Sequence, residues 1–391
     1  MFSARFPAEF RPNRLTLALE AMRRAGTDIF DLTESNPTHA GLVYPPEILR
    51  AFEDERLLRY DPSPAGLLET REAVSAYYAA RGHRIAPERI LLTASTSEAY
   101  AYLFKLLANP GDEVLVPRPS YPLFEFLATM ESVQIRTYPL TYHGQWGIDL
   151  DALAAVATAR TRAVILVNPN NPTGSFLKRA ELDFLTRWCA AREVALISDE
   201  VFADYAFGPD PHRVSTVAEV EECLAFSMSG LSKIAGLPQM KLGWIVAAGP
   251  PGLRTPALER LEWVADTYLS VSTPVQRAAA RLFAAGENVQ QQIRTRTRDN
   301  LEFALQTLDG SCANLLAVEG GWYVIVQAPR VLSEEEWTLG LLAECHVLVQ
   351  PGFFYDFESE AFLVVSLLAE TTRFREGFAR LARFLRHRSV Q

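Results

Sequence analysis

Three short apolar segments, each ended by polar residues, constrain the fold of this chain more than any other feature of its sequence. They cover residues 161–169, 194–200 and 241–249, and a helical pattern over residues 179–193 separates the first from the second. Apolar runs of this length without alternation are typical of strands in a parallel sheet with both faces covered. The sequence therefore predicts an α/β fold around such a sheet.

The polar residues that end the first two segments are candidates for a binding site. Residues 168–171 and residues 199–200 come at the end of a predicted strand. Ligands of parallel α/β sheets bind beyond the carboxyl ends of the strands. We therefore expect these residues to face a ligand.

Composition narrows the class of protein. The 391 residues are 49% hydrophobic and 22% charged, and the formal net charge of −9 argues against a nucleic-acid partner. No apolar run has the length of a membrane span, and the first residues lack the pattern of a signal peptide. Four widely spaced cysteines without a CxxC pair indicate free thiols in a reducing compartment and no metal site. We expect a soluble, cytoplasmic protein with two or three structural units.

The pattern changes after about residue 255. A helical stretch over residues 273–308 precedes strand-like segments and an amphipathic, arginine-rich helix over residues 371–388. That last helix carries an apolar stripe, formed by Phe374, Phe378, Leu381 and Leu385. A terminal helix packed on the protein explains the stripe better than a membrane or nucleic-acid patch does.

Lys233 stands in a run of small residues rather than on a charged helix face. A lysine that attacks a carbonyl must be desolvated or held near other charges, so that its amine is neutral at working pH. The neighbouring Ser229, Gly230 and Ser232 leave room for a cofactor to approach. Taken alone, Lys233 is better explained as a lysine of a surface loop.

Three motifs occur in order along the chain: NPNNPTG at residues 168–174, SDEVFADY at 198–205 and LSKIAGLPQMKLGW at 231–244. Together they resemble the class I and II aminotransferases, fold-type-I enzymes that use pyridoxal 5′-phosphate (PLP). The resemblance extends from residue 31 to the last helix. It implies an enzyme that moves an amino group between a small-molecule amino donor and a keto acid.

The same resemblance implies how the chain is divided into domains. Residues 46–255 form a large domain that binds PLP on a mostly parallel, seven-stranded sheet between helices. Residues 1–45 and 256–391 form a smaller α+β domain.

Three residues carry the main chemistry in this resemblance. Lys233 forms the Schiff base with the cofactor aldehyde and then moves the Cα proton of the substrate. Asp199 pairs with the protonated pyridine nitrogen and keeps the ring an electron sink, although an aspartate after a strand is also a frequent helix N-cap. Asn171 donates a hydrogen bond to the ring oxygen, although NPTG by itself is a good turn.

Further cofactor contacts follow from the resemblance. Tyr121 lies flat against the pyridine ring, with a core tyrosine as the alternative, and Ser232 lets the cofactor approach. Lys241 replaces the family's phosphate-binding arginine and keeps its charge without the bidentate geometry. The phosphate also meets a helix N-terminus, at Ser95, Thr96 and Ser97. A simple N-cap explains one of these hydroxyls, and Ser95 stands where the family has a glycine.

Tyr60 bears on the oligomeric state. It matches a tyrosine that, in this family, reaches the phosphate bound to the neighbouring subunit. The resemblance therefore implies a homodimer with shared active sites. A tyrosine packed within its own loop is the alternative.

Two positions depart from the family. Phe202 stands where a tyrosine donates to the ring oxygen, and Val364 stands where an arginine binds the substrate carboxylate. An apolar side chain cannot pair with a carboxylate, so we expect unusual recognition of the substrate carboxylate. The substitutes that lie near the motifs are Arg11, Arg14 and Arg373. An apolar wall beside Val364 is expected from Phe353, Phe354 and Tyr355, unless these residues belong to the core.

Three functions stay open at this point. An aminotransferase of unusual specificity is the leading hypothesis. A PLP-dependent lyase, decarboxylase or condensing or cyclising enzyme is the alternative, because the loss of the carboxylate clamp frees the choice of bond to be cleaved. A regulatory or binding protein that keeps the fold without catalysis is the third.

Overall fold

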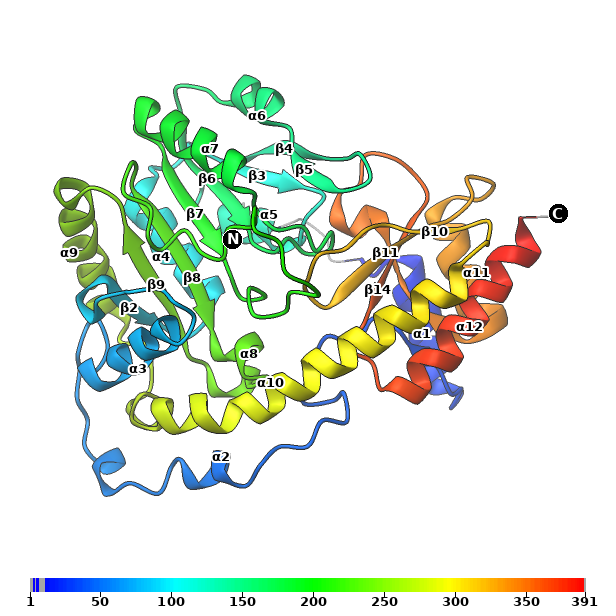
Figure 1. Ribbon diagram of the computed structural model, residues 1–391, viewed down its shortest axis with the longest axis horizontal. Coiled ribbons are helices and arrows are strands. Elements are labelled where there is room, and N and C mark those ends of the chain that lie inside the picture. The colour runs from blue at the N-terminus through cyan, green and yellow to red at the C-terminus, as the bar shows by residue number, and fades with distance from the viewer. Residues whose placement is uncertain (1–2, 4, 7–10, 390–391) are drawn as a thin grey trace.

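The computed structural model describes residues 3, 5–6 and 11–389 of the chain. An eight-stranded sheet lies toward one end of the molecule and a four-stranded sheet toward the other, and helix α10 (Thr273–Leu308) spans the distance between them (Figure 1). A two-stranded sheet pairs β1 (Phe30–Asp31) with β12 (Val347–Leu348). The N-terminal segment therefore joins the C-terminal part of the chain.

The large sheet is mostly parallel, as predicted, and the three apolar segments form β6, β7 and β9. The expectation of a parallel strand was wrong for the third segment, because β9 is antiparallel to both of its neighbours. Only β9 and the short β5 run antiparallel to their neighbours. Because β5 turns back beside β4, the sheet has eight strands, and the expected count of seven was wrong by one. The order is β2 (Ile90–Thr93), β9 (Gly243–Ala248), β8 (Ala225–Gly230), β7 (Ala195–Asp199), β6 (Thr161–Val167), β3 (Glu113–Arg118), β4 (Gln134–Tyr142) and β5 (Trp146–Ile148).

Helices cover both faces of this sheet, which explains why its strands are apolar throughout. In β6, Val164 and Leu166 belong to one apolar cluster, whereas Ala163 and Ile165 belong to another. The first cluster includes residues of α3 (Leu68–Ala79), α6 (Leu150–Val156) and α7 (Arg179–Arg192). The second includes residues of α4 (Thr96–Leu107), α5 (Leu123–Met130) and α9 (Pro251–Tyr268).

The small sheet is antiparallel and packs on the last helix. Its strands lie in the order β10 (Asn314–Leu315), β11 (Tyr323–Gln327), β14 (Phe362–Ser366) and β13 (Gln350–Pro351). Residues of α10, α11 (Glu334–Cys345) and α12 (Thr371–Arg388) share one apolar cluster with it. All four residues of the predicted stripe on α12 are buried in that cluster, so the prediction of a packed terminal helix is confirmed.

The remaining elements are short or peripheral. They are α1 (Arg14–Arg24), α2 (Glu47–Arg50), α8 (Leu231–Ile234), and the 3-10 turns η1 (Glu55–Leu58), η2 (Pro87–Arg89), η3 (Pro238–Met240) and η4 (Gly352–Tyr355). Within the part of the chain that is described, no helix combines the length and apolarity needed to cross a membrane. The four cysteines are free thiols, as expected.

The division into domains stays a prediction. The expected boundary at residue 255 lies inside α9, and the buried Ala257, Leu261 and Ala265 of this helix pack with the large sheet. The chain leaves that sheet only after α9, where α10 begins at Thr273.

Candidate active site

A cavity of about 310 Å³ opens at the carboxyl ends of β6, β7 and β8, where the sequence predicted a ligand. Lys233 lines this cavity together with eight of the nine other predicted site residues. The eight are Ser95, Thr96, Ser97, Tyr121, Asn171, Asp199, Ser232 and Lys241. Tyr60 is the exception.

Lys233 lies on α8, a helix of four residues that follows β8 directly. Burial lowers the pKa of its amine, and the carboxylate of Asp199 opposes this shift. The ring centroids of Trp322 and Phe202 lie 5.1 and 5.8 Å from Nζ and 5.1 Å from each other, so an aromatic pair borders the amine on one side. The surroundings therefore favour a neutral amine, which is the form that attacks a carbonyl.

The other three lysines of the chain lack these surroundings. Lys105 pairs with Glu131 at 2.5 Å, and Lys178 pairs with Asp210 at 2.7 Å. Lys241 is exposed at the mouth of the cavity. Lys233 is therefore the one lysine among the four that combines burial with access to the cavity.

Asp199 ends β7, beside the strand that leads to Lys233. Its carboxylate accepts hydrogen bonds from the backbone N–H of Val201 at 3.2 Å and from the hydroxyl of Tyr100 at 3.4 Å. Burial raises the pKa of Asp199 from its ordinary 3.8 to about 6, against the effect of these donors and of Lys233. Turns rather than a helix follow Asp199 in the described chain, so the N-cap alternative is wrong.

One corner of the cavity is built to receive an anion. Ser95 is the N-cap of α4, and its Oγ accepts from the backbone N–H of Glu98 at 3.1 Å, so the N-cap explanation holds for this hydroxyl. The first N–H groups of a helix have no partner within it, and they attract negative charge. Gly243 permits close packing here, because a Cβ on it would lie 3.2 Å from the carbonyl carbon of Ser95.

Asn171 and Tyr121 both offer groups to a ligand. Asn171 is buried, and its Oδ1 has no hydrogen-bond partner in the described structure. Buried polar atoms are nearly always paired, so this side chain is arranged for a polar group that binds in the cavity. Tyr121 is 46% exposed at the cavity wall, so the alternative of a core tyrosine is wrong.

Sequence reasoning missed three polar residues of the cavity: Tyr100, which donates to Asp199, and the more distant Ser35 and Tyr323. Ser35 comes from the N-terminal segment, and Tyr323 begins β11 of the small sheet. Both lie far from the motifs in the sequence. Tyr323 stands in an apolar strand pattern that gives no sign of a site.

The structure also locates the two positions that depart from the family and the arginines suggested as substitutes. Phe202 lines the cavity, whereas Val364 is 1% exposed and belongs to the apolar cluster behind it. None of the arginines suggested as substitutes lines the cavity: Arg14 pairs with Glu335, Arg373 pairs with Asp28, and Arg11 is exposed elsewhere.

The expected apolar wall is also built differently. Neither Phe353, Phe354 nor Tyr355 lines the cavity. The core alternative holds for Tyr355, which is buried, and for Phe354, which packs against the same cluster, whereas Phe353 is 48% exposed. Ser120 donates its backbone N–H to the carbonyl of Tyr355 at 3.0 Å. Three residues on and beside α5 supply apolar lining instead: Leu123, Phe124 and Leu127.

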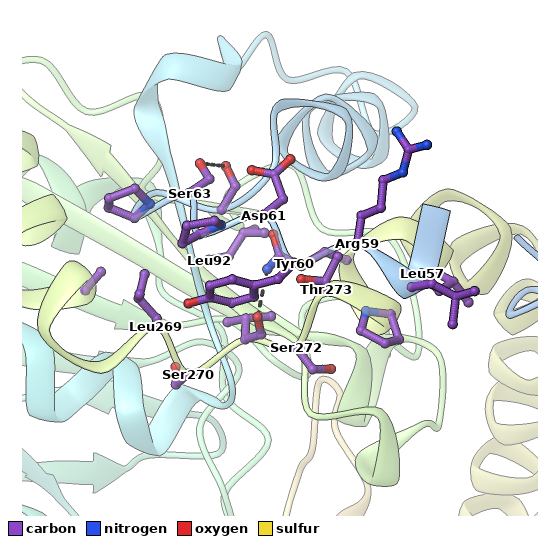
Figure 2. Close-up of a pocket in the computed structure, with 18 of the residues that line it drawn as sticks. Leu57, Arg59, Tyr60, Asp61, Ser63, Leu92, Leu269, Ser270, Ser272 and Thr273 are labelled. Atoms are coloured by element: carbon purple, nitrogen blue, oxygen red, sulfur yellow. Dashed lines mark hydrogen bonds between the residues drawn. The ribbon is translucent and has the colours of Figure 1, made fainter. Parts of the chain in front are cut away.

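Tyr60 lies outside this cavity and is 74% exposed, so the alternative of a packed loop residue is wrong. It lines a second cavity of about 370 Å³ (Figure 2). The chain on either side of Tyr60 and the segment between α9 and α10 form the walls of this cavity.

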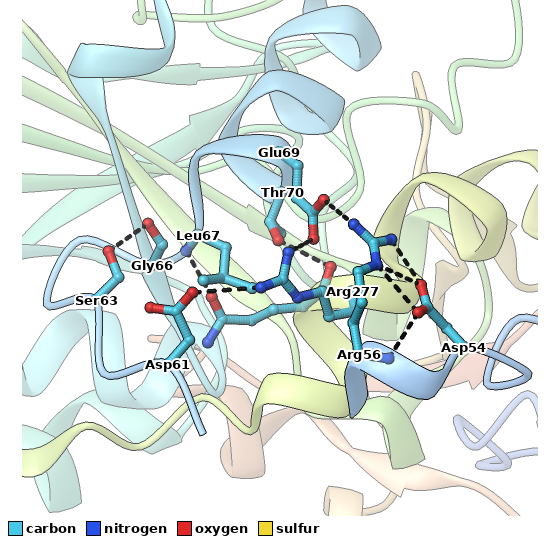
Figure 3. Close-up of polar contacts among 10 residues, drawn as sticks. Asp54, Arg56, Asp61, Ser63, Gly66, Leu67, Glu69, Thr70 and Arg277 are labelled. Atoms are coloured by element: carbon cyan, nitrogen blue, oxygen red, sulfur yellow. Dashed lines mark hydrogen bonds and ion pairs between the residues drawn. The ribbon is translucent and has the colours of Figure 1, made fainter. Parts of the chain in front are cut away.

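The segment that presents Tyr60 is anchored on both sides (Figure 3). Before Tyr60, Arg56 binds Glu69 at 3.2 Å. Arg277 on α10 binds Glu69 at 2.6 Å and Asp61 at 3.3 Å. Thr70 donates its hydroxyl to the backbone carbonyl of Gln276 at 2.8 Å. Tyr60 is therefore held in place although its own side chain is in solvent.

Comparisons with known proteins agree on one family. The sequence profile described as aminotransferase class I and II matches residues 27–375. The glutamate-pyruvate aminotransferase AlaA of Haemophilus influenzae is 27% identical over 386 residues, which cover 94% of this chain and 93% of that protein. Human tyrosine aminotransferase is 30% identical over 223 residues, which cover 56% of this chain and 49% of that protein. The structure of an alanine aminotransferase from Pyrococcus furiosus shares the fold, with a TM-score of 0.86 at 22% identity and coverage of 96% and 100%.

The raised pKa of Asp199 predicts a pH dependence of stability. Between about pH 4 and pH 6 the folded protein holds the Asp199 proton more tightly than the unfolded chain does. As the pH rises from about 4 to about 6, the free energy of unfolding of the cofactor-free wild type should therefore fall by about 2 to 3 kcal/mol relative to that of Asp199→Asn. Urea unfolding of both proteins at several pH values measures the difference. A difference that does not change with pH would contradict the burial of this carboxyl.

Proposed function

This chain belongs to the class I and II aminotransferases and is a PLP-dependent enzyme, and we propose that it binds PLP in the 310 Å³ cavity with Lys233 as the attachment point. The observation that carries the proposal is the convergence of Lys233, Asp199 and Asn171 in that cavity. The helix N-terminus at Ser95 fits a phosphate, and Asn171 lines the same cavity with a side-chain amide whose nitrogen can donate to a polar ring.

When bound, PLP supplies a reactive aldehyde and a ring that takes up the electrons released at the substrate Cα. Lys233 has two tasks in this proposal: its neutral amine holds the cofactor, and its Nζ later carries the Cα proton. Both tasks need an amine that can be neutral near pH 7, and the burial of Lys233 favours that form.

Asp199 and Asn171 act on the cofactor ring in this proposal. A cation next to a buried carboxylate lowers the pKa of the carboxyl, so a protonated ring nitrogen would keep Asp199 ionised and would itself keep its proton. Asn171 is the proposed donor to the ring oxygen. Tyr205 cannot replace the hydroxyl missing at Phe202, because its own hydroxyl donates to the backbone carbonyl of Lys233 at 2.5 Å.

The phosphate is proposed to bind at the N-terminus of α4, where Thr96 and Ser97 begin the helix. Lys241 lines the same cavity and is proposed to add a positive charge for the phosphate. Ser232 lies beside Lys233, and Tyr121 is proposed to cover the ring. A lysine keeps the charge of an arginine but binds phosphate at a single point.

The charged residues that line the cavity bear on how the substrate is recognised when valine stands at position 364. The charged side chains that line the cavity in the described structure are Asp199, Lys233 and Lys241, and all three are assigned to the cofactor. A carboxylate buried without a partner costs several kcal/mol. We therefore propose an amino donor whose Cα carries an uncharged group, or whose carboxylate stays outside the cavity.

Transamination remains the favoured reaction. The relatives named above are aminotransferases, and no observation favours a decarboxylating, eliminating or condensing enzyme over them. The family assignment also argues against the third hypothesis, a binding protein that keeps the fold without catalysis.

A homodimer is part of the proposal. Tyr60 and Leu58 are 74% and 90% exposed on one anchored segment, next to an open cavity. Exposed aromatic residues on a fixed backbone are typical anchors of protein interfaces. We propose that Tyr60 crosses to the partner subunit and reaches the phosphate bound there.

Lys233→Ala tests the assignment of the attachment point. This variant should lack the visible absorbance of lysine-bound PLP and should give no measurable amino transfer, because no other amine lines the cavity except the exposed Lys241. Lys105→Ala is the matched control and should keep both properties. An active, yellow Lys233→Ala protein would overturn the proposed function.

The charge of the donor can be tested directly. Single-turnover rates with alaninamide should exceed those with alanine by at least about tenfold, because only alanine brings an unpaired carboxylate into the cavity. A wild-type enzyme that prefers alanine would contradict the proposed specificity.

Mixed dimers test the position of Tyr60. Tyr60→Ala alone should weaken PLP binding by about tenfold to a hundredfold, through the loss of a hydrogen bond to a charged group. In a mixed dimer, the Tyr60→Ala chain keeps Lys233 and the Lys233→Ala chain keeps Tyr60. One of the two sites then combines both intact residues, and tight PLP binding should return in that site. A monomeric protein, or mixed dimers no better than Tyr60→Ala, would rule out the shared site.

A further inference from the structure

The helix that carries Lys233 is too short to hold itself in place. Helix α8 has four residues, and the last carbonyl groups of any helix lack partners within it. The carbonyl of Lys233 accepts from the backbone N–H of Gly236 at 3.3 Å, and two side chains from other parts of the chain add hydrogen bonds at this end of the helix. The hydroxyl of Tyr205 donates to the carbonyl of Lys233 at 2.5 Å, and Nε2 of Gln290 donates to the carbonyl of Ile234 at 2.6 Å.

The amide of Gln290 is fixed by a second contact. Its Nε2 also donates to the carboxylate of Asp204 at 2.8 Å. A side-chain amide nitrogen carries two hydrogens, so these two acceptors use both of them. Gln290 is 6% exposed, and solvent has little access to either bond. The amide therefore bridges the carboxylate and the α8 carbonyl in one orientation.

Asp204 is itself firmly held. It accepts from Arg81 at 2.6 and 2.9 Å and from the hydroxyl of Tyr77 at 3.0 Å. Arg294, one turn after Gln290 on α10, donates to the backbone carbonyl of Asp204 at 2.9 Å. The carboxylate thus forms a fixed reference point for Gln290.

Helix α10 passes directly beneath α8 (Figure 1). Gly286 of α10 makes this possible, because a Cβ there would lie 2.5 Å from the Cβ of Ala235. On the next turn of α10, Gln290 reaches the end of α8. The support of α8 therefore comes from a helix that continues to the small sheet, where Asn300 donates to the carbonyls of Leu367 and Ala369 at 2.9 Å.

We propose that Tyr205 and Gln290, with Asp204 behind them, are positioning residues that hold the main chain of Lys233 so that its Nζ points into the cavity. This inference rests on the proposed role of Lys233. The three side chains act through the backbone of α8, and none of them lines the cavity. A misplacement of about 1 Å in a reacting group can cost about a hundredfold in rate, so loss of this support should slow the chemistry without weakening substrate binding.

Gln290→Met tests the proposal, because methionine fills a similar volume but donates no hydrogen bond. We expect kcat to fall roughly tenfold to a hundredfold while KM stays within about twofold, the pattern of a lost transition-state interaction. The cofactor-free variant should also capture added PLP more slowly, as followed by visible absorbance. Gln292→Met is the matched control: Gln292 lies on the same helix but bonds to Val43, and its variant should behave as wild type.

A role in stability alone would give a different result. A Gln290→Met protein with a lower melting temperature but unchanged kcat and unchanged PLP capture would overturn the proposal. If Gln290→Met does not fold, Tyr205→Phe is the second test, because it keeps the ring and removes only the hydrogen bond to the carbonyl of Lys233. An unchanged kcat of Tyr205→Phe would also overturn the proposal. Failure of the proposed function is distinguishable, because wild type itself would then not attach PLP to Lys233.

Discussion

A primary amine that is buried must lose its proton or keep a carboxylate partner, and this constraint shapes the site around Lys233. The amine lies beside the paired rings of Phe202 and Trp322, with the carboxylate of Asp199 as the one opposing charge that shifts its pKa. Burial of Asp199 works in the opposite sense and raises the pKa of that carboxyl to about 6. The site thus holds two groups whose pKa values have moved toward neutrality, which suits proton transfer near pH 7.

The fold brings these groups together by a simple route. Strands β7 and β8 are parallel neighbours, so the residues after them meet at the same edge of the sheet. The small sheet closes the cavity from the other side with Tyr323, and α10 links both sheets while it supports α8 from below. The lysine therefore depends on elements that lie far from it in the sequence.

This arrangement explains which features the sequence predicted. Patterns local to the chain predicted β6, β7 and the buried stripe of α12, because each depends on neighbouring residues. The meeting of Lys233 with Asp199 was implied by the resemblance to the aminotransferases and not by a local pattern. Ser35, Tyr323 and Gln290 depend on contacts between distant segments, and their own surroundings in the sequence carry no signal. The wall expected from residues 353–355 was wrong for the same reason: Tyr355 packs into the core, and a backbone hydrogen bond joins it to the distant Ser120.

The central claim is that one amine among four holds the cofactor, since the chain contains only Lys105, Lys178, Lys233 and Lys241. Borohydride reduction of the PLP-loaded enzyme fixes the cofactor to whichever lysine carries it, and peptide mass mapping identifies that residue. The account predicts the added mass on the peptide that contains Lys233, with the other three lysines unmodified. Cofactor fixed on Lys241, Lys105 or Lys178, or on no lysine, would contradict it.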